Sequence, residues 1–139
     1  DWGSYLCGKW LEEYCYSILL KCIPRNKLKD IRIGLEITWD YVDATQEGTN
    51  AQEFDIILTD GHKLTIVECK AGRNLESAVI DKLQNCVKKY GGVTGRGVLI
   101  TAYPINNEVA RNKLNEAGML NHAHGDDLES ALLEVFRFL

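Results

Sequence analysis

The chain has 139 residues, of which 45% are hydrophobic and 26% charged, and its formal net charge at pH 7 is −4. This length and composition fit one ordinary globular domain with a buried core. A mildly acidic chain does not coat nucleic acid by charge alone, and no apolar run approaches the ~20 residues that a membrane-spanning helix needs. No secretory signal peptide opens the sequence, and its first residue, Asp1, is expected for a processed chain or for a domain excised from a longer one.

The five cysteines include no CxxC pair and leave an odd one, which indicates buried free thiols rather than a disulfide framework or a zinc site. Three of them, Cys7, Cys15 and Cys22, are spaced so that they share one face of a helix. Reduced thiols are typical of cytoplasmic proteins, and we expect a cytoplasmic location here.

The first half of the chain shows two clear periodicities. Apolar residues recur at helical spacing over 5–22, which predicts an amphipathic helix that Pro24 ends. Strict alternation of apolar and polar residues over 31–39 predicts a half-buried strand. The polar, turn-rich stretch 43–51 is predicted to be a loop.

Two further strands are predicted over 53–59 and 62–69, separated by Asp60-Gly61. This dipeptide favours a two-residue type I′ turn, in which both central residues have positive φ. The register that follows pairs Thr59 with His62, Ile57 with Leu64, Asp55 with Ile66, and Glu53 with Glu68.

The rest of the chain alternates helices with short strands, which completes the order αβββαβα(β)α and predicts an α/β fold. The elements are a helix over 75–90 with a glycine cap at Gly91-Gly92, an interior strand over 97–101, an exposed helix over 107–119, a short strand over 119–123, and a final helix, capped by Asp126 or Asp127, with Leu128, Leu132, Leu133 and Phe136 facing inward.

The predicted register puts three ionisable side chains, Asp55, Glu68 and Lys70, on one face of the sheet. Diagonal neighbours across two strands lie about 7–8 Å apart. Two carboxylates at that spacing repel each other unless a cation lies between them. Mg²⁺ or Mn²⁺ suits such a site, because carboxylates, waters and phosphate oxygens are their usual ligands.

These residue types fit the hydrolysis of a phosphodiester. Asp55 and Glu68 are predicted to bind the metal, with the backbone carbonyl of Cys69 as a further ligand. Lys70 is predicted to position the attacking water or to stabilise the negative charge that develops. The structural alternative is a solvated ion pair between Glu68 and Lys70, which is the usual meaning of an isolated E-x-K.

Asp55, followed on the next strand by Glu68-Cys69-Lys70, resembles the motif of the PD-(D/E)xK nuclease superfamily, whose αβββαβ core has the order predicted above. Four segments resemble the nuclease domain of the DUF1887 group: GKWLEEY (8–14), QEFDIIL (52–58), LTIVECKAG (64–72) and YGGVTGRGVLI (90–100). That group comprises CRISPR-associated ancillary nucleases in which a CARF domain precedes the nuclease and senses cyclic oligoadenylate. The resemblance covers most of the chain from Gly8 to Ile100.

The resemblance implies a restriction-endonuclease-like fold with a mixed central sheet, and a single nuclease domain over residues 1–139. It implies an endonuclease that depends on Mg²⁺ or Mn²⁺, cuts DNA with RNA as a further substrate, serves CRISPR or related antiviral defence, and works as a homodimer. Glu12 falls at the position of a helix-1 glutamate that completes the metal site in such nucleases. Glu13 and Glu53 are the competing candidates.

Other functions stay open. Holliday-junction resolvases and restriction-type endonucleases share the motif and the fold, and a nuclease-derived domain can bind nucleic acid or a partner without cutting. Several basic residues are candidates for phosphate contacts around the site, although a solvated surface position is the commoner explanation for each: Arg25, Lys27, Lys29, Arg73, Lys82, Lys88, Lys89 and Arg96.

Overall fold

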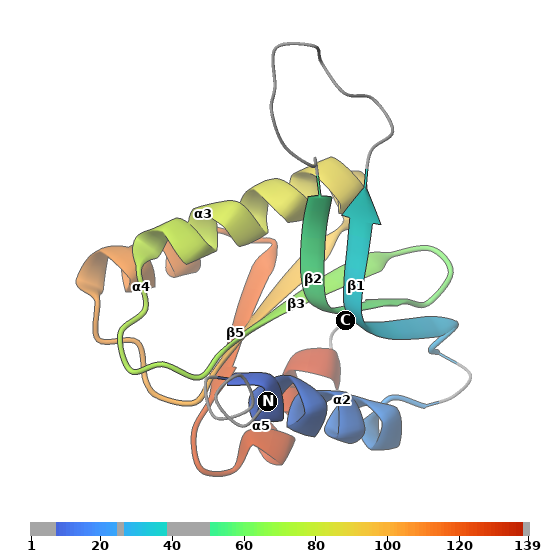
Figure 1. Ribbon diagram of the computed structural model, residues 1–139, viewed down its shortest axis with the longest axis horizontal. Coiled ribbons are helices and arrows are strands. Elements are labelled where there is room, and N and C mark those ends of the chain that lie inside the picture. Colours follow the sequence, from blue (N-terminus) through green and yellow to red (C-terminus); the bar gives the residue numbers. More distant parts are fainter. Residues whose placement is uncertain (1–7, 25–26, 39–50, 138–139) are drawn as a thin grey trace.

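The computed structural model describes residues 8–24, 27–38 and 51–137, which form a sheet between two layers of helices (Figure 1). In chain order the elements are α2 (Trp10–Cys22), β1 (Asp30–Thr38), β2 (Ala51–Thr59), β3 (Leu64–Lys70), α3 (Ser77–Cys86), the π-helical turn η2 (Val87–Gly91), the 3-10 turn η3 (Gly92–Thr94), β4 (Arg96–Thr101), α4 (Glu108–Glu116), β5 (Leu120–His124) and α5 (Leu128–Arg137). No helix among these residues is long and apolar enough to span a membrane.

The sheet has five strands in the order β1-β2-β3-β4-β5. β1, β2 and β3 are antiparallel neighbours, whereas β3, β4 and β5 run parallel, so the sheet is mixed as expected. Helices α3 and α4 pack on one face and contribute Ile80, Leu83 and Leu114 to one core cluster. Helices α2 and α5 cover the other face and contribute Leu11 and Leu132 to a second cluster. The predicted α/β architecture is confirmed.

Strand β4 lies inside the sheet, as its continuous apolar run predicts. Val98, Leu99 and Ile100 are completely buried and alternate between the two core clusters. Gly97 has no room for a side chain, because an added Cβ would collide with Leu120. This strand therefore fixes the position of β3, which carries the E-x-K motif.

The ends of several helices differ from the prediction. α4 ends at Glu116, before Met119, and Asp127 is the residue that caps α5, accepting the backbone N–H of Ser130 at 3.1 Å. Leu133 was predicted to face inward but is 44% exposed. Of the loop predicted over 43–51, Ala51 is instead the first residue of β2, and residues 43–50, like Trp39, lie outside the described residues.

The register between β2 and β3 also differs from the prediction. Thr59 pairs with Leu64 and Ile57 pairs with Ile66, so the connecting loop comprises residues 60–63 rather than two residues. The predicted pairing is wrong by two positions. Since side chains alternate with a period of two, a shift of two positions leaves Ile57 and Ile66 on the shared face that was predicted.

The longer loop has a local cause in Asp60. Its carboxylate accepts the backbone N–H groups of His62 at 2.8 Å and Lys63 at 2.7 Å, which closes a wider turn. Gly61 has a φ of 96°, but no described non-glycine residue has positive φ. A type I′ turn needs positive φ at Asp60 as well, so it does not form.

The side chains of β1 and β2 switch from one face of the sheet to the other at two facing positions, Gly34 and Asp55. Phe54 packs in the α3–α4 cluster, whereas Ile56 packs in the α2–α5 cluster. Residues two apart in a regular strand share a face, so β2 must twist between them. The neighbouring pairs, Ile33 with Ile56 and Leu35 with Phe54, place Asp55 opposite Gly34. Gly34 has a φ of 61°, which is strained for any residue with a side chain. This kink takes Asp55 out of ordinary strand geometry.

Candidate active site

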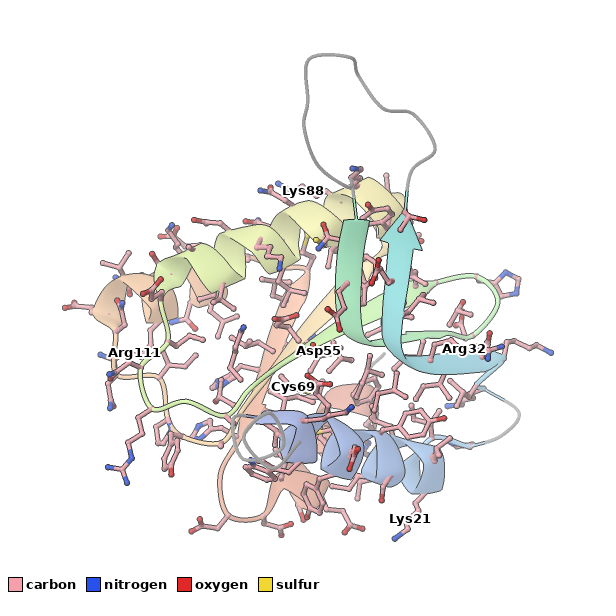
Figure 2. All side chains as sticks on the ribbon, in the orientation of Figure 1. Lys21, Arg32, Asp55, Cys69, Lys88 and Arg111 are labelled. Carbon is pink, nitrogen blue, oxygen red and sulfur yellow. The ribbon has the colours of Figure 1, made fainter. Side chains whose placement is uncertain are left out.

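The antiparallel ladder between β2 and β3 stops beside the E-x-K motif. Its last pair is Ile56 with Val67. Beyond it, the carboxylate of Asp55 accepts the backbone N–H of Cys69 at 2.8 Å. Backbone N–H groups of a strand lie in the plane of the sheet, so this carboxylate lies in the gap between the two strands and not on one face. Figure 2 shows both residues close together above α2.

Glu68 and Lys70 follow on β3 and form an ion pair, with 3.4 Å between Oε1 and Nζ. The Glu68 side chain is 19% exposed and that of Lys70 is 43% exposed. Burial raises the pKa of Glu68, and the charge of Asp55 raises it further, while Lys70 and Lys82 act in the opposite direction. The two motif residues share a face as predicted, and Asp55 interacts with them from the strand gap.

Glu12 joins this group from the first turn of α2. Partial burial, the charge of Asp55 and a hydrogen bond to Asp55 raise its pKa to about 7, with smaller contributions from Glu53 and Glu68. Two carboxyl groups that share a hydrogen bond must hold one proton between them. Glu12 and Asp55 therefore lie close enough to compete for a single proton or a single cation.

These residues surround a cavity of about 760 Å³ between α2 and the kinked strands. Its lining includes Glu12, Asp55, Cys69 and Lys70, and also the two competing candidates Glu13 and Glu53. Glu68 lies just outside the lining, where it pairs with Lys70. Four of the five acidic residues singled out from the sequence thus face one opening.

The donor chemistry fits a hard divalent cation, although no three described His, Cys, Asp or Glu side chains are already arranged as a metal-binding group. Each carboxylate instead takes a neighbouring partner: Asp55 binds the Cys69 N–H, and Glu68 pairs with Lys70. With Glu12 ionised, three carboxylates and one ammonium leave a charge of −2. A divalent cation neutralises that charge, and carboxylate oxygens are its preferred ligands.

The thiol of Cys69 lies away from this chemistry. It packs in the α2–α5 cluster, where a hydrogen bond with Cys15 and burial raise its pKa well above the ordinary value. A neutral buried thiol is a poor metal ligand, so the backbone carbonyl is the donor that Cys69 can offer. Cys15, Cys69 and Cys86 are buried free thiols, as predicted; Cys7 and the side chain of Cys22 lie outside the described residues.

A histidine to which sequence reasoning assigned no role lies two strands away from Glu68 in the sheet. β5 places His122 in line with Leu99 and Glu68, across two parallel pairs. The Thr101 hydroxyl donates to the Tyr103 carbonyl at 2.7 Å, so His122 Nε2, also 2.7 Å away, must be the donor to it. Burial and the neighbouring His124 lower the pKa of His122 to about 4.

The mixed five-stranded sheet with flanking helices is an α/β fold consistent with a nuclease-like core. The family model for the Card1-like endonuclease domain matches residues 3–139, and the chain belongs to that family. The expectation of a nuclease domain is confirmed at this level. No curated protein matches the chain.

Solved structures share the fold at low identity. Protein VC1899 from Vibrio cholerae superposes with a TM-score of 0.80 at 21% identity, covering 96% of this chain and 35% of that one. Can2 from Sulfobacillus thermosulfidooxidans, in complex with cyclic tetra-adenylate, gives 0.74 at 22% identity, with 97% and 36% covered. AF1548, a protein of unknown function, gives 0.59 at 14% identity, with 94% and 67% covered. The chain thus spans about a third of the length of VC1899 and Can2.

Proposed function

We propose that this chain is a metal-dependent endonuclease of the PD-(D/E)xK type that hydrolyses phosphodiester bonds of DNA, with RNA as a further substrate. The observation that carries the proposal is the cluster of Glu12, Asp55 and Lys70 at one cavity, with Glu68 paired to Lys70 beside it. Membership of an endonuclease family supports it independently.

In this proposal the acidic residues bind Mg²⁺ or Mn²⁺. Asp55 and Glu68 would hold the ion through carboxylate oxygens, with the backbone carbonyl of Cys69 as a further donor. Glu12 is preferred over Glu13 and Glu53 as the third carboxylate because it hydrogen-bonds to Asp55. Bound at such a site, a divalent ion polarises a phosphoryl oxygen and lowers the pKa of a coordinated water.

Lys70 is the residue that acts on the reacting groups in this proposal. Its ammonium, held at 3.4 Å by Glu68, would orient the attacking water and stabilise negative charge as it develops on the phosphate. Glu68 would therefore have two roles, as a metal ligand and as the group that fixes Lys70.

We further propose that the activity serves CRISPR or related antiviral defence and that two copies act together as a homodimer. The family membership and the likeness in fold to Can2 support the first proposal. A dimer would bring two active sites to one substrate, and the oligomeric state is measured directly by light scattering.

The test is cleavage of plasmid DNA, single-stranded DNA and RNA by the purified chain with Mn²⁺, Mg²⁺ or EDTA. Glu68→Gln and Asp55→Asn should lower the rate ~100-fold or more. Glu116→Gln, which removes an exposed carboxylate on α4, should leave it unchanged. Cleavage that survives both EDTA and Glu68→Gln would overturn the proposal.

The same assay separates the alternatives. A strong preference for four-way junctions over linear DNA would favour a resolvase, and cleavage at fixed sequences would favour a restriction-type enzyme. Binding without cleavage, together with no measurable Mn²⁺ affinity by calorimetry, would favour a nuclease-derived binding domain.

A further inference from the structure

A second cavity, of about 900 Å³, lies at the other end of α2 and β3, and we call it the basic cavity. Its walls come from the segment after α2, the loop between β2 and β3, the start of β4 and the end of α5. The cationic residues in its lining are Lys27, Lys29, Lys63, Arg96 and Arg137. Five of the chain's sixteen lysines and arginines thus gather at one opening of a protein whose net charge is −4.

Most of this positive charge has no acidic partner. Lys27, Lys29, Lys63 and Arg96 form no ion pair with any residue that the structure describes. The single acidic residue in the lining, Asp60, uses its carboxylate to accept two backbone N–H groups of its own turn. Five cations against this one carboxylate leave a net positive charge in the lining, which raises the local potential and attracts anions.

Helix dipoles do not explain the cluster. Arg137 belongs to the last turn of α5, where a cation complements the dipole. Lys29 and Lys63, however, flank the loop between β2 and β3, and an added Cβ on Gly61 would lie 3.2 Å from the Lys29 side chain. Arg96 begins β4. These cations therefore belong to strand ends and loops rather than to helix ends.

The floor of the basic cavity is apolar. Leu58 forms part of the core, and Leu133, the residue predicted to face inward, is exposed here beside Phe136. The ligand that suits cations over an apolar floor has repeated negative charges and flat, partly apolar groups. A nucleic-acid strand has both.

The basic cavity and the active-site cavity are lined by different parts of the same two strands. On β1, Gly34 lines the first cavity while Lys29, just before the strand, lines the second; on β3 the corresponding residues are Cys69 and Thr65. Four or five strand residues correspond to about 15 Å. Figure 1 shows the β2–β3 loop and the start of β1 on the same side of the molecule as the C-terminal end of α2. Along one strand of a duplex, 15 Å is about four or five phosphates.

We propose that the basic cavity binds the phosphodiester backbone of the nucleic-acid substrate about four or five phosphates from the bond that is cut. This inference rests on the proposed endonuclease function. The cations lie around the opening on separate segments, so they match a chain of phosphates rather than a single phosphate group.

The test measures nucleic-acid binding rather than cleavage, in EDTA, by fluorescence anisotropy of labelled oligonucleotides at several salt concentrations. The variant is Lys29→Gln/Lys63→Gln. The matched control, Arg111→Gln/Lys113→Gln, also removes two positive charges, but from α4, whose residues line neither cavity. Equal melting temperatures establish that both variants are folded.

We expect the cavity variant to weaken binding of a 20-nucleotide strand or duplex ~10-fold and to reduce the salt slope by about 1.4 to 1.8, the value for two phosphate contacts. The control should change neither. Salt slopes that are the same for the variant and the control would overturn the inference.

ATP, a mononucleotide, tests whether the basic cavity binds a free nucleotide or the backbone of a nucleic-acid strand. If the cavity variant loses affinity for ATP but keeps full affinity for the 20-nucleotide strand, the cavity takes a free nucleotide and the inference is wrong. Failure of the proposed function would look different, because the chain would then cut no substrate with any metal while the difference in binding persisted.

Discussion

Replacing Glu12 by glutamine tests whether the carboxylates of the active site are as close as the structure places them. The pKa of Glu12 rises from 4.5 to about 7 in the folded chain, through burial and through Asp55. Above that pKa the folded protein carries a charged Glu12 close to other carboxylates, and these negative charges repel one another. Glutamine removes this repulsion, and its side-chain amide still donates a hydrogen bond to Asp55. Glu12→Gln should therefore stabilise the metal-free protein at alkaline pH.

The magnitude follows from the size of the shift. A shift of this size would be worth ~3 kcal/mol in a buried site, but Glu12 is only partly buried, so solvent screening reduces the figure to on the order of 1 kcal/mol. That corresponds to about 3–5 °C in melting temperature for a domain of this size.

The contribution of Glu12 to the stability of the folded protein depends on pH. A raised carboxyl pKa means that the folded state binds the proton more tightly, so stability from Glu12 increases as the pH falls from about 7 to 4.5. The advantage of Glu12→Gln should thus be present at about pH 8 and absent near about pH 5. Burial and Asp55 also raise the pKa of Glu68, which acts in the same direction in both proteins.

Thermal melts in EDTA check this, with Glu13→Gln as the matched control because it removes the same charge one residue along the helix. If Glu12→Gln is no more stable than Glu13→Gln at alkaline pH, the proposed proximity of Glu12 and Asp55 is wrong. Added Mn²⁺ should then stabilise the unmodified chain more than Glu12→Gln, because the variant lacks one of the proposed ligands.

Three further substitutions test separate parts of the structure. Gly34→Ala should lower the free energy of unfolding in urea by on the order of 1 kcal/mol, because Gly34 has a left-handed φ of 61°. Gly118→Ala should be neutral, because Gly118 has as much space for a Cβ and no such φ. Equal losses for the two variants would contradict a kink at Gly34. Thr101→Val should lower stability by about 1–3 kcal/mol because it leaves the His122 N–H without its acceptor. Thr101→Ser, which keeps the hydroxyl, should recover most of that loss in the same guanidinium titration. Lys70→Met should slow cleavage ~100-fold while Mn²⁺ affinity by calorimetry stays level or improves; a parallel fall in affinity would mean that Lys70 supports the metal site instead.

Much of the fold follows from local sequence patterns. The order of helices and strands is carried by periodicity, and the buried run over 97–101 identifies the interior strand β4 without any tertiary information. The cap at Asp127 follows from the same kind of local chemistry, since its carboxylate accepts both the N–H and the hydroxyl of Ser130.

The parts that sequence reasoning missed depend on competition or on distant contacts. The two-residue turn was predicted from the Asp60-Gly61 dipeptide, but the Asp60 carboxylate binds two further N–H groups and stabilises a wider loop. Leu133 was placed inward by helical phase alone, and the opening beside it forms only when α5 meets the β2–β3 loop.

The candidate site itself was partly predictable. The motif indicates that Asp55 and Glu68 act together, and the resemblance to the nuclease family implies Glu12, with Glu13 and Glu53 as competing candidates. That Asp55 lies in the gap between strands could not be predicted, because it depends on the left-handed backbone of Gly34 on a third segment. The place of His122 required knowledge of how β4 and β5 align with β3.

The hydrogen bond from the Cys69 backbone to the Asp55 side chain changes how inactive variants should be interpreted. This side chain takes the place of a main-chain acceptor, so it helps to hold β3 against β2 as well as carrying a charge. Truncation to alanine would remove both contributions at once and leave an amide proton with no acceptor. Asparagine keeps an oxygen for that proton and removes only the charge, so it is the replacement that isolates chemistry from architecture at this residue.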